Sequence, residues 1–333
     1  MRLFASFVLA AALALGATGC GVLSEVAGRA YGRTVDADWL TVRRDLAYRA
    51  GSDDPKHTLD VYLPSTVRPG RPWPVVVFVH GGGWTTGDKQ LRVGSFRPYD
   101  NLARRLALDT VGVVLVNYRL IEAGSKGQGR AGSVGLDDQI ADVAAATAWV
   151  RATIARYGGD ASRVFLMGHS AGAQLAARLA LDPAPLRAAG ATATAPVCGV
   201  VSVSGAGFDL TDRRSVADDY RYFGARFAPP GASVPRSMPS TPAAWQTDAS
   251  PATFVTAGAP PFRFFVADGE EASFRQQAER LRARLAAAGV DVPAPTTFHA
   301  DTHALGALAM SDPKGVVGRE VAAFVKDTRC GAR

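Results

Sequence analysis

A five-residue stretch from Gly168 to Gly172 reads GHSAG, matches the pattern G-x-S-x-G and could hold a nucleophilic serine, Ser170. The apolar run Val164–Met167 before it predicts a short buried strand, and the Ala- and Leu-rich stretch after it predicts a helix. A strand that turns directly into a helix around a serine needs small neighbours, because the turn is crowded. We therefore expect the Ser170 hydroxyl to stand exposed at the end of the strand, where the free N–H groups of the helix N-terminus point.

A second stretch that could do chemistry reads HGGGW and runs from His80 to Trp84. It directly follows the continuous apolar run Pro74–Val79, which predicts a strand buried on both faces. Three glycines at the end of a central strand let the backbone come close to a ligand and turn its N–H groups towards it. The stretch therefore indicates a loop that offers backbone N–H groups to a bound group.

The two stretches in this order, HGGGW after a buried strand and then GHSAG, resemble the α/β-hydrolase esterases of the hormone-sensitive-lipase and carboxylesterase type. In that family the glycine loop and the amide after the nucleophile form an oxyanion hole. The resemblance implies that the donors here are the amides of Gly81, Gly82 and Ala171, with Gly83 as an alternative. It also implies the α/β-hydrolase fold.

A serine hydroxyl is a weak nucleophile at neutral pH, so it needs a base, which is usually a histidine oriented by a carboxylate. The resemblance places this base after the last strand, where His299 and His303 lie. The loop Asp301–Leu305 resembles the family's loop that ends in a histidine at the start of a helix. We therefore expect His303 to be the base, and His299 is the other candidate. The remaining histidines lie in an expected edge strand, in the glycine loop and beside the nucleophile: His57, His80 and His169.

The acid that orients the base is expected where the strand Phe262–Ala267 ends, and three carboxylates follow it: Asp268, Glu270 and Glu271. Counted back without gaps from the next helix, Glu270 takes the family's acid position. The family more often has Asp there, so a Glu is a departure. We expect Glu270 to be the acid, and Asp268 and Glu271 stay open as alternatives.

The resemblance implies a serine carboxylic-ester hydrolase that acts on a small-molecule ester through an acyl-enzyme and needs no cofactor. Two other interpretations stay open. The segment Glu270–Gln277 also resembles formamide-hydrolysing relatives, which would make the chain an arylformamidase-like amide hydrolase. The chain could also be a catalytically inactive hydrolase-fold protein that acts as a surface binding protein.

Strands alternate with helices along the chain, which predicts an α/β class fold with a mostly parallel, doubly wound sheet and helices on both faces. We expect one hydrolase domain over residues 41–330 that opens with an antiparallel pair of strands. Residues 205–249 lack clear periodicity and could be an insertion that forms a lid or part of the substrate pocket, or a surface loop. The expected strands are 43–48, 57–63, 74–79, 111–117, 164–167, 197–203, 261–266 and 290–292 with 296–298, and the expected helices include 99–108, 138–157, 273–289 and 316–327.

Residues 1–19 have the pattern of an export signal, with a charged start, a short apolar run and small residues at the end. The apolar run is too short for a comfortable membrane span. Cys20 follows the small residues directly, as in bacterial lipoprotein signals, so we expect cleavage before Cys20 and a lipid on its sulfur. A plain secretory signal is the alternative. Residues 20–40 would then be a tether, and the protein would be exported to the bacterial cell envelope or periplasm and anchored to a membrane by its lipid.

Export implies an oxidising compartment, in which the two other cysteines, Cys198 and Cys330, could pair. The sequence does not tell whether they do, because pairing needs the two residues to lie close together in the fold. No spacing of Cys and His residues indicates a metal site.

The composition is that of a globular protein, with 47% hydrophobic and 20% charged residues among 333. The formal net charge is +7, but the Lys and Arg residues are scattered along the chain. A nucleic-acid surface would need them clustered in a stripe or patch. The charge pattern therefore argues against nucleic acid as a partner.

Overall fold

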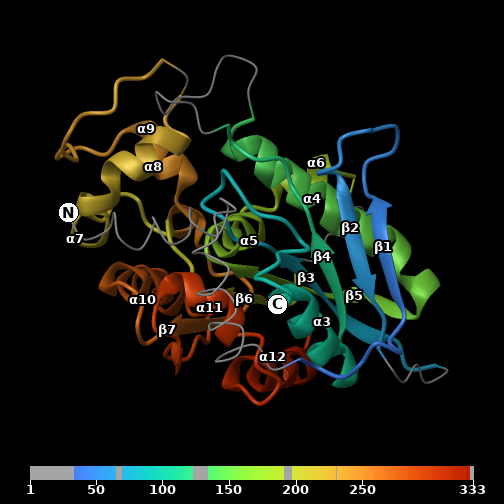
Figure 1. The fold of residues 1–333 in the computed structure, drawn as a ribbon. Coiled ribbons are helices and arrows are strands. Elements are labelled where there is room, and N and C mark those ends of the chain that lie inside the picture. The colour runs from blue at the N-terminus through green and yellow to red at the C-terminus, as the bar shows by residue number, and fades with distance from the viewer. Residues whose placement is uncertain (1–33, 65–69, 123–133, 191–196, 230, 331–333) are drawn as a thin grey trace.

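The computed structural model describes residues 34–64, 70–122, 134–190, 197–229 and 231–330 (Figure 1). The expected signal peptide, Cys20 and the first part of the expected tether lie outside these residues. No helix within the described ranges is long and apolar enough to cross a membrane.

Eight strands of the described chain form one sheet in the order β1-β2-β4-β3-β5-β6-β7-β8. The pairs β1–β2 and β2–β4 are antiparallel, and the strands from β4 to β8 run parallel to one another. The expected opening pair and the mostly parallel sheet are both confirmed. The strands are β1 (Val42–Ala47), β2 (Thr58–Tyr62), β3 (Trp73–Val79), β4 (Gly112–Val116), β5 (Gly159–His169), β6 (Val200–Val203), β7 (Phe262–Ala267) and β8 (Thr296–Phe298).

Helices cover both faces of this sheet (Figure 1). The α-helices are α3 (Pro98–Leu108), α4 (Leu136–Thr153), α5 (Ala171–Leu181), α6 (Ala184–Ala188), α7 (Arg213–Val216), α8 (Tyr220–Phe227), α9 (Ala244–Ala249), α10 (Ala272–Ala287), α11 (His303–Ala309) and α12 (Val316–Asp327). Short 3-10 turns are η1 (Ile154–Tyr157), η2 (Ala217–Asp219) and η3 (Pro251–Phe254).

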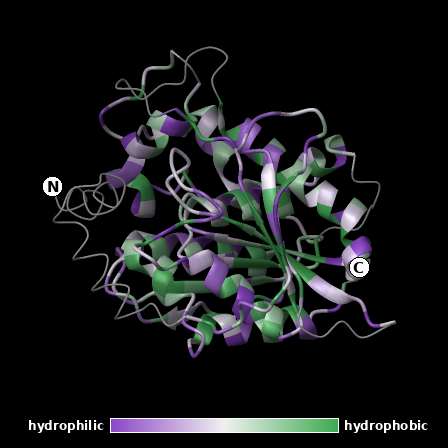
Figure 2. Ribbon diagram, turned by 45° about the vertical axis from the view of Figure 1, so that its right-hand side comes forward, coloured by the Kyte–Doolittle hydropathy of each residue, from purple (hydrophilic) through white to green (hydrophobic). Residues whose placement is uncertain are grey.

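The core has two halves, one on each face of the sheet, because successive side chains of a strand point to opposite faces. Along β3, Val75, Val77 and Val79 pack with the apolar sides of α4, α5 and α10, whereas Val76 and Phe78 pack with those of α3 and α12. Strands buried on both faces need hydrophobic residues at every position, as β3 has. Figure 2 accordingly shows hydrophobic residues gathered on the central strands.

The structure adds detail to one local expectation and differs from another. Residues 205–249, which show no periodicity, contain three short helices, α7, α8 and α9. These helices have four to eight residues, too few turns for a repeating pattern. The difference concerns residues 290–292, which were expected in the last strand but lie outside β8.

Residues 34–40, the end of the expected tether, lie against the domain. Val35, Ala37 and Leu40 are buried with Ala107 of α3 in a small apolar cluster. The amide of Val35 also donates to Oδ1 of Asn101 on α3, at 2.6 Å. This part of the expected tether therefore packs on α3.

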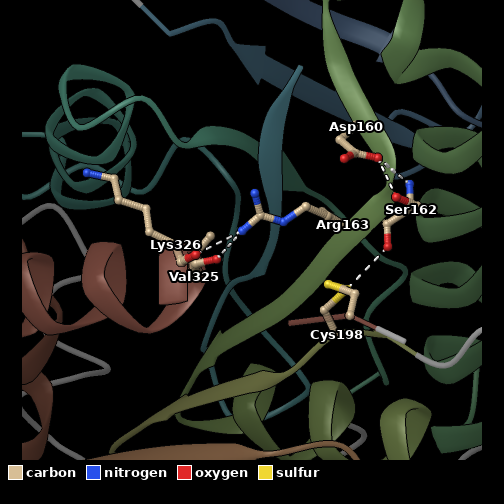
Figure 3. The surroundings of a disulfide bond; sticks show 7 residues. Asp160, Ser162, Arg163, Cys198, Val325 and Lys326 are labelled. Carbon is tan, nitrogen blue, oxygen red and sulfur yellow. Dashed lines mark hydrogen bonds between the residues drawn. A yellow bond between two sulfur atoms is a disulfide. The ribbon is translucent and has the colours of Figure 1, made fainter. Parts of the chain in front are cut away.

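A disulfide bond joins Cys198, just before β6, to Cys330, beyond α12 (Figure 3). On the same side of the sheet, Arg163 of β5 donates to the carbonyl oxygen of Val325 at 2.9 Å, so the end of α12 is held at two points. The Cys198 sulfur also lies 3.2 Å from the carbonyl oxygen of Ser162. A disulfide sulfur has no proton to donate, so this is a close contact rather than a hydrogen bond.

We predict that removing the disulfide destabilises the fold, because the bond restricts the unfolded chain across a separation of 132 residues. The double variant Cys198→Ser/Cys330→Ser should lose about 3–5 kcal/mol of unfolding free energy. Urea unfolding without reductant measures this loss. Reductant should lower the stability of the native protein and leave that of the double variant unchanged, and equal stability of the two proteins without reductant would contradict the prediction.

Candidate active site

The residues expected to do chemistry gather at the carboxyl ends of the parallel strands. Val79 at the end of β3 pairs with Gly168 of β5, so the glycine loop and the serine turn leave the sheet side by side. A cavity of about 760 Å³ lies elsewhere, next to the disulfide, and is lined by Phe262 and Arg263 at the start of β7. The expected site is therefore distinct from this cavity.

The serine turn has the strained geometry that its sequence predicts. Ser170 precedes the first residue of α5 and has φ 53° and ψ −122°, a conformation that residues other than glycine rarely adopt. A side chain at Gly168 would place its Cβ 2.2 Å from the Gly172 carbonyl oxygen. One at Gly172 would come equally close, 2.2 Å, to the carbonyl oxygen of Val79. Both glycines are therefore needed for the turn to form.

Ser170, His303 and Glu270 form a chain of hydrogen bonds. The Ser170 hydroxyl lies 2.9 Å from Nε2 of His303, and Nδ1 of His303 lies 3.2 Å from Oε2 of Glu270. Because a carboxylate can only accept, Nδ1 carries the proton and Nε2 is free to accept the hydroxyl proton. Thr302 caps α11, with its side chain accepting from the amide of Leu305, and His303 is the first residue of that helix.

The three carboxylates after β7 have different environments. The Glu270 side chain is 1% exposed, and its Oε1 accepts from the amide of Ala267 at 3.0 Å. Asp268 is 46% exposed and pairs with His299 instead. Glu271 takes the position before the first residue of α10. Of the three candidates for the acid, Glu270 is the one whose carboxylate meets His303.

His299, the other candidate base, forms a second histidine–carboxylate pair at the surface. Its Nδ1 lies 2.9 Å from Oδ2 of Asp268. The hydrogen bond and charge of Asp268 raise the pKa of His299, and in return the hydrogen bond lowers the pKa of Asp268. The structure places Ser170 against His303 and not against this pair.

Two aromatic rings lie close to the His303 imidazole and nearly parallel to it. Phe274 of α10 stacks on it with centroids 4.0 Å apart, and the ring of His169 lies 5.7 Å away. The ring planes differ by 21° and 14°. The sequence patterns did not indicate Phe274 as a residue of the site. It lies four residues after Glu270, in the first turn of α10, which begins at Ala272.

The amides of the glycine loop do not all face the same way. The Gly81 N–H donates to the hydroxyl of Tyr99 at 3.2 Å, which differs from its expected place in the oxyanion hole. Within the described residues, the amides of Gly82, Gly83 and Ala171 have no hydrogen-bond acceptor in the protein. Gly83, the alternative donor, therefore replaces Gly81 among the amides that are open to a ligand.

Two neighbouring carbonyl groups explain these orientations, since C=O and N–H of one trans peptide point in opposite directions. The Gly81 carbonyl oxygen accepts from Nδ1 of His80 at 2.8 Å, which aims the Gly82 N–H the other way. The Gly82 carbonyl oxygen accepts from the amide and the hydroxyl of Thr86, at 3.0 and 2.8 Å. The Gly83 N–H, which belongs to the same peptide, therefore points away from Thr86.

Two buried histidines beneath the site stay neutral. Burial lowers the pKa of His80 to about 4. Burial, followed by repulsion from His303 and His80, lowers the pKa of His169 to about 3. The Tyr99 hydroxyl accepts from the Gly81 amide and donates its own proton to Nδ1 of His169, at 3.1 Å. A neutral His169 adds no positive charge beside the imidazolium that His303 would form as a base.

Comparison with protein families gives one match over most of the domain. The BD-FAE family model matches residues 59–285, more than half of this 333-residue chain. The matched range includes the glycine loop, Ser170 and Glu270, and it ends before His303.

Several curated relatives are named as esterases. Esterase LipQ of Mycobacterium tuberculosis is 32% identical over 235 residues, which are 68% of this chain and 48% of that protein. A probable isoprenylcysteine alpha-carbonyl methylesterase of Oryza sativa subsp. japonica is 35% identical over 143 residues, 43% of this chain and 29% of that protein. The matches therefore span less than half the length of these two relatives.

Solved structures have the same fold at low identity. Esterase B from Lactobacillus rhamnosis superposes with a TM-score of 0.68 at 20% identity and covers 96% of this chain and 95% of its own. A truncated carbohydrate esterase from gut microbiota gives 0.63 at 17% identity, covering 88% of this chain and 98% of that one. These neighbours confirm the expected α/β-hydrolase fold.

We predict that the buried neutral histidines make the fold less stable in acid. The pKa of His80 is lower in the folded protein than the ordinary 6.5 of an unfolded chain, so between about pH 6.5 and 4 only the unfolded chain takes up the proton. The unfolding free energy should therefore decrease as the pH is lowered from about 6.5 to 4. Each such histidine contributes up to about 1.4 kcal/mol per pH unit to this decrease.

Urea unfolding of the native protein and of His80→Asn across this window measures the effect. Asn keeps a donor for the Gly81 carbonyl but does not titrate. The variant should lose less stability per pH unit than the native protein. Identical slopes would show that His80 does not contribute.

Proposed function

The chain belongs to the BD-FAE family and has the α/β-hydrolase fold, and on this basis we propose that it is a carboxylesterase-like serine hydrolase. The observation that carries the proposal is the hydrogen-bonded chain from Ser170 through His303 to Glu270. These three side chains come from the turn after β5, the start of α11 and the turn after β7. Their meeting point beside open backbone amides supports acyl transfer through a covalent intermediate.

In the first half of the reaction, His303 Nε2 takes the proton of Ser170 while the serine oxygen attacks the ester carbonyl carbon. Glu270 holds the imidazole by its Nδ1–H and stabilises the positive charge that develops on the ring. The amides of Gly82, Gly83 and Ala171 are the donors for the oxyanion. In enzymes of this type such a donor is worth about 3–4 kcal/mol of transition-state stabilisation.

Collapse of the tetrahedral intermediate expels the alcohol, which receives its proton from His303. Ser170 is then acylated. In the second half, His303 takes a proton from water, and the resulting oxygen nucleophile attacks the acyl carbon. Release of the acid returns the proton to Ser170, so the cycle needs only water as second substrate.

The substrate class follows from the family and from the names of the relatives, which are methylesterases, esterases and a carbohydrate esterase. We propose a small-molecule carboxylic ester. Amide hydrolysis of an N-formyl arylamine and an inactive binding protein are the two competing outcomes of the test below.

We further propose that the protein is exported and anchored to a membrane of the bacterial cell envelope by a lipid on Cys20. The sequence pattern of residues 1–20 carries this proposal. The disulfide between Cys198 and Cys330 supports export, because such bonds persist in oxidising compartments.

We predict that Ser170→Ala and His303→Ala each lower kcat by roughly 10⁴–10⁶-fold, because both groups act in the same step. Glu270→Gln should lower kcat by roughly 10⁴-fold, since the amide can hold the wrong tautomer. His299→Ala is the matched control, because it removes the neighbouring exposed histidine and should leave kcat/KM nearly unchanged. Hydrolysis of p-nitrophenyl acetate by folded variants measures all four.

A panel of p-nitrophenyl esters and N-formylkynurenine distinguishes the substrate classes. Turnover of the esters without turnover of the formamide supports the ester hydrolase, and the reverse result supports the amide hydrolase. A folded protein that hydrolyses neither substrate and does not react with a fluorophosphonate at Ser170 would be an inactive hydrolase-fold protein. Full activity of His303→Ala would overturn the assignment of the base.

For the lipid anchor, we predict that Cys20→Ser moves the protein from the membrane fraction to the soluble fraction, because the variant has no sulfur to acylate. Immunoblots of fractionated cells measure the distribution, and Cys198→Ser is the control that keeps the anchor. An unchanged distribution of Cys20→Ser would leave a plain secretory signal as the explanation of residues 1–19.

A further inference from the structure

The glycine loop has a backbone conformation that it does not adopt easily by itself. Gly82, Gly83 and Trp84 follow one another with φ of 129°, 59° and 66°. Glycine tolerates such values, but a tryptophan is strained there by its Cβ. The loop therefore needs contacts from the rest of the protein to stay in this conformation.

Helix α8 provides several of these contacts through the Trp84 ring. The ring is 2% exposed and packs on three aromatic residues of α8, Tyr222, Phe223 and Phe227, at centroid distances of 6.3, 5.9 and 4.9 Å. Its Nε1 donates to the side chain of Gln174 on α5 at 3.2 Å. The strained residue is thus fixed between two helices, and α8 lies in the 205–249 region (Figure 1).

A second contact from α8 reaches the loop backbone directly. Nε of Arg226 donates to the carbonyl oxygen of Gly83 at 3.0 Å, across 143 positions of sequence. The Arg226 guanidinium stacks on the ring of Tyr222 at 3.4 Å and also donates to the Tyr222 carbonyl oxygen at 2.9 Å. Two hydrogen bonds and a stacked ring together fix the direction from which this cation meets the loop.

The electrostatics of Arg226 point to the loop as its main partner. Within the described part of the chain, no carboxylate forms an ion pair with Arg226. Burial lowers the pKa of Arg226, which means that its charge is only partly solvated. A cation in such a place depends on the carbonyl groups that it binds, and among the described residues the Gly83 carbonyl is the one that it binds outside its own helix.

Arg226 completes a series of three held carbonyls. Donors from His80 and Thr86 hold the carbonyls of Gly81 and Gly82, and Arg226 holds that of Gly83. A rotation of either of the first two peptides would turn the N–H of Gly82 or Gly83 away from the site, because the C=O of one residue and the N–H of the next belong to one planar peptide. The Gly83 carbonyl shares its peptide with the Trp84 N–H, so Arg226 fixes the peptide that directly follows Gly83. Of the three donors, Arg226 is the one supplied by the 205–249 region.

We propose that Arg226 is a positioning residue for the oxyanion hole, and that α8 serves to hold the glycine loop in its reactive conformation. This inference rests on the proposed ester hydrolysis. It gives the 205–249 region a role in the chemical step besides any contact with substrate. Loss of the Arg226 contact should therefore slow the step in which the oxyanion forms and leave substrate binding largely intact.

The test compares Arg226→Ala and Arg226→Lys with Arg221→Ala, which removes an exposed arginine from the same helix. All three are made in the full chain, and circular dichroism and urea unfolding verify their folding. We expect Arg226→Ala to lower kcat on p-nitrophenyl acetate by about 10- to 100-fold with little change in KM. Arg226→Lys keeps the charge without the planar donor group, and should lie between Arg226→Ala and the native protein.

Two readouts separate positioning from a merely structural role. A trifluoromethyl ketone forms a tetrahedral adduct with the serine, so its inhibition constant should rise by about the factor by which kcat/KM falls. Low concentrations of guanidinium ion should restore part of the activity of Arg226→Ala, because the ion can occupy the vacated place beside the Gly83 carbonyl. Arg221→Ala should behave like the native protein in both assays.

The inference would be overturned if Arg226→Ala and Arg226→Lys kept the native kcat, or if only their KM changed. Hydrolysis by the native protein would still support the proposed function in that case. If Arg226→Ala does not fold, the folded Arg226→Lys decides by the same split between kcat and KM. A native protein that neither hydrolyses the ester nor reacts with a fluorophosphonate would overturn the proposed function and this inference together.

Discussion

The close crossing of two backbones is the constraint on which the site depends. β3 and β5 are neighbours in the sheet, and the segments that follow both strands leave the sheet at the same edge. Gly172, at the start of α5, lies so close to the carbonyl oxygen of Val79 that a Cβ would come within 2.2 Å of it. Because this space is filled, the start of α5 must lie directly against the glycine loop. Ser170 and the loop amides are therefore brought together by backbone packing and do not rely on a flexible side chain.

Within that frame, the direction of each loop amide is set by what holds the carbonyl of the same peptide. The amides that stay open belong to peptides whose oxygen accepts a hydrogen bond from His80 or Thr86, and the amide of Gly81 is taken by Tyr99. A preorganised group of this kind needs no reorientation when charge develops on a substrate oxygen. The strained φ of Trp84 belongs to the same arrangement, since contacts of its buried side chain with α8 and with Gln174 keep it in place.

Burial distinguishes two histidine–carboxylate pairs of similar composition. Asp268 and His299 lie at the surface, where solvent screens the interaction and the pair has no contact with the nucleophile. Glu270, two residues further along the chain, is buried and bonded to His303, whose ring stacks on Phe274. A carboxylate that is shielded from water and fixed by a backbone amide can hold an imidazole in one tautomer and one orientation. The environment of each pair, rather than the residue types, decides which one can serve Ser170.

The amino-acid sequence by itself determined the α/β class, the serine turn, the glycine loop and His303 as the first residue of a helix after the last strand. The first three follow from local patterns: apolar runs, small residues at a crowded turn, and the alternation of strands with helices. His303 followed from the resemblance of the loop Asp301–Leu305 to the family's loop. Only the tertiary structure decided that Glu270 is the carboxylate beside His303, that Gly83 rather than Gly81 has the open amide, and that Arg226 reaches the loop. It also decided that the two cysteines, 132 residues apart in sequence, are joined. Each of these depends on contacts between distant parts of the chain, and the short-range pattern around a residue does not encode which distant group will meet it.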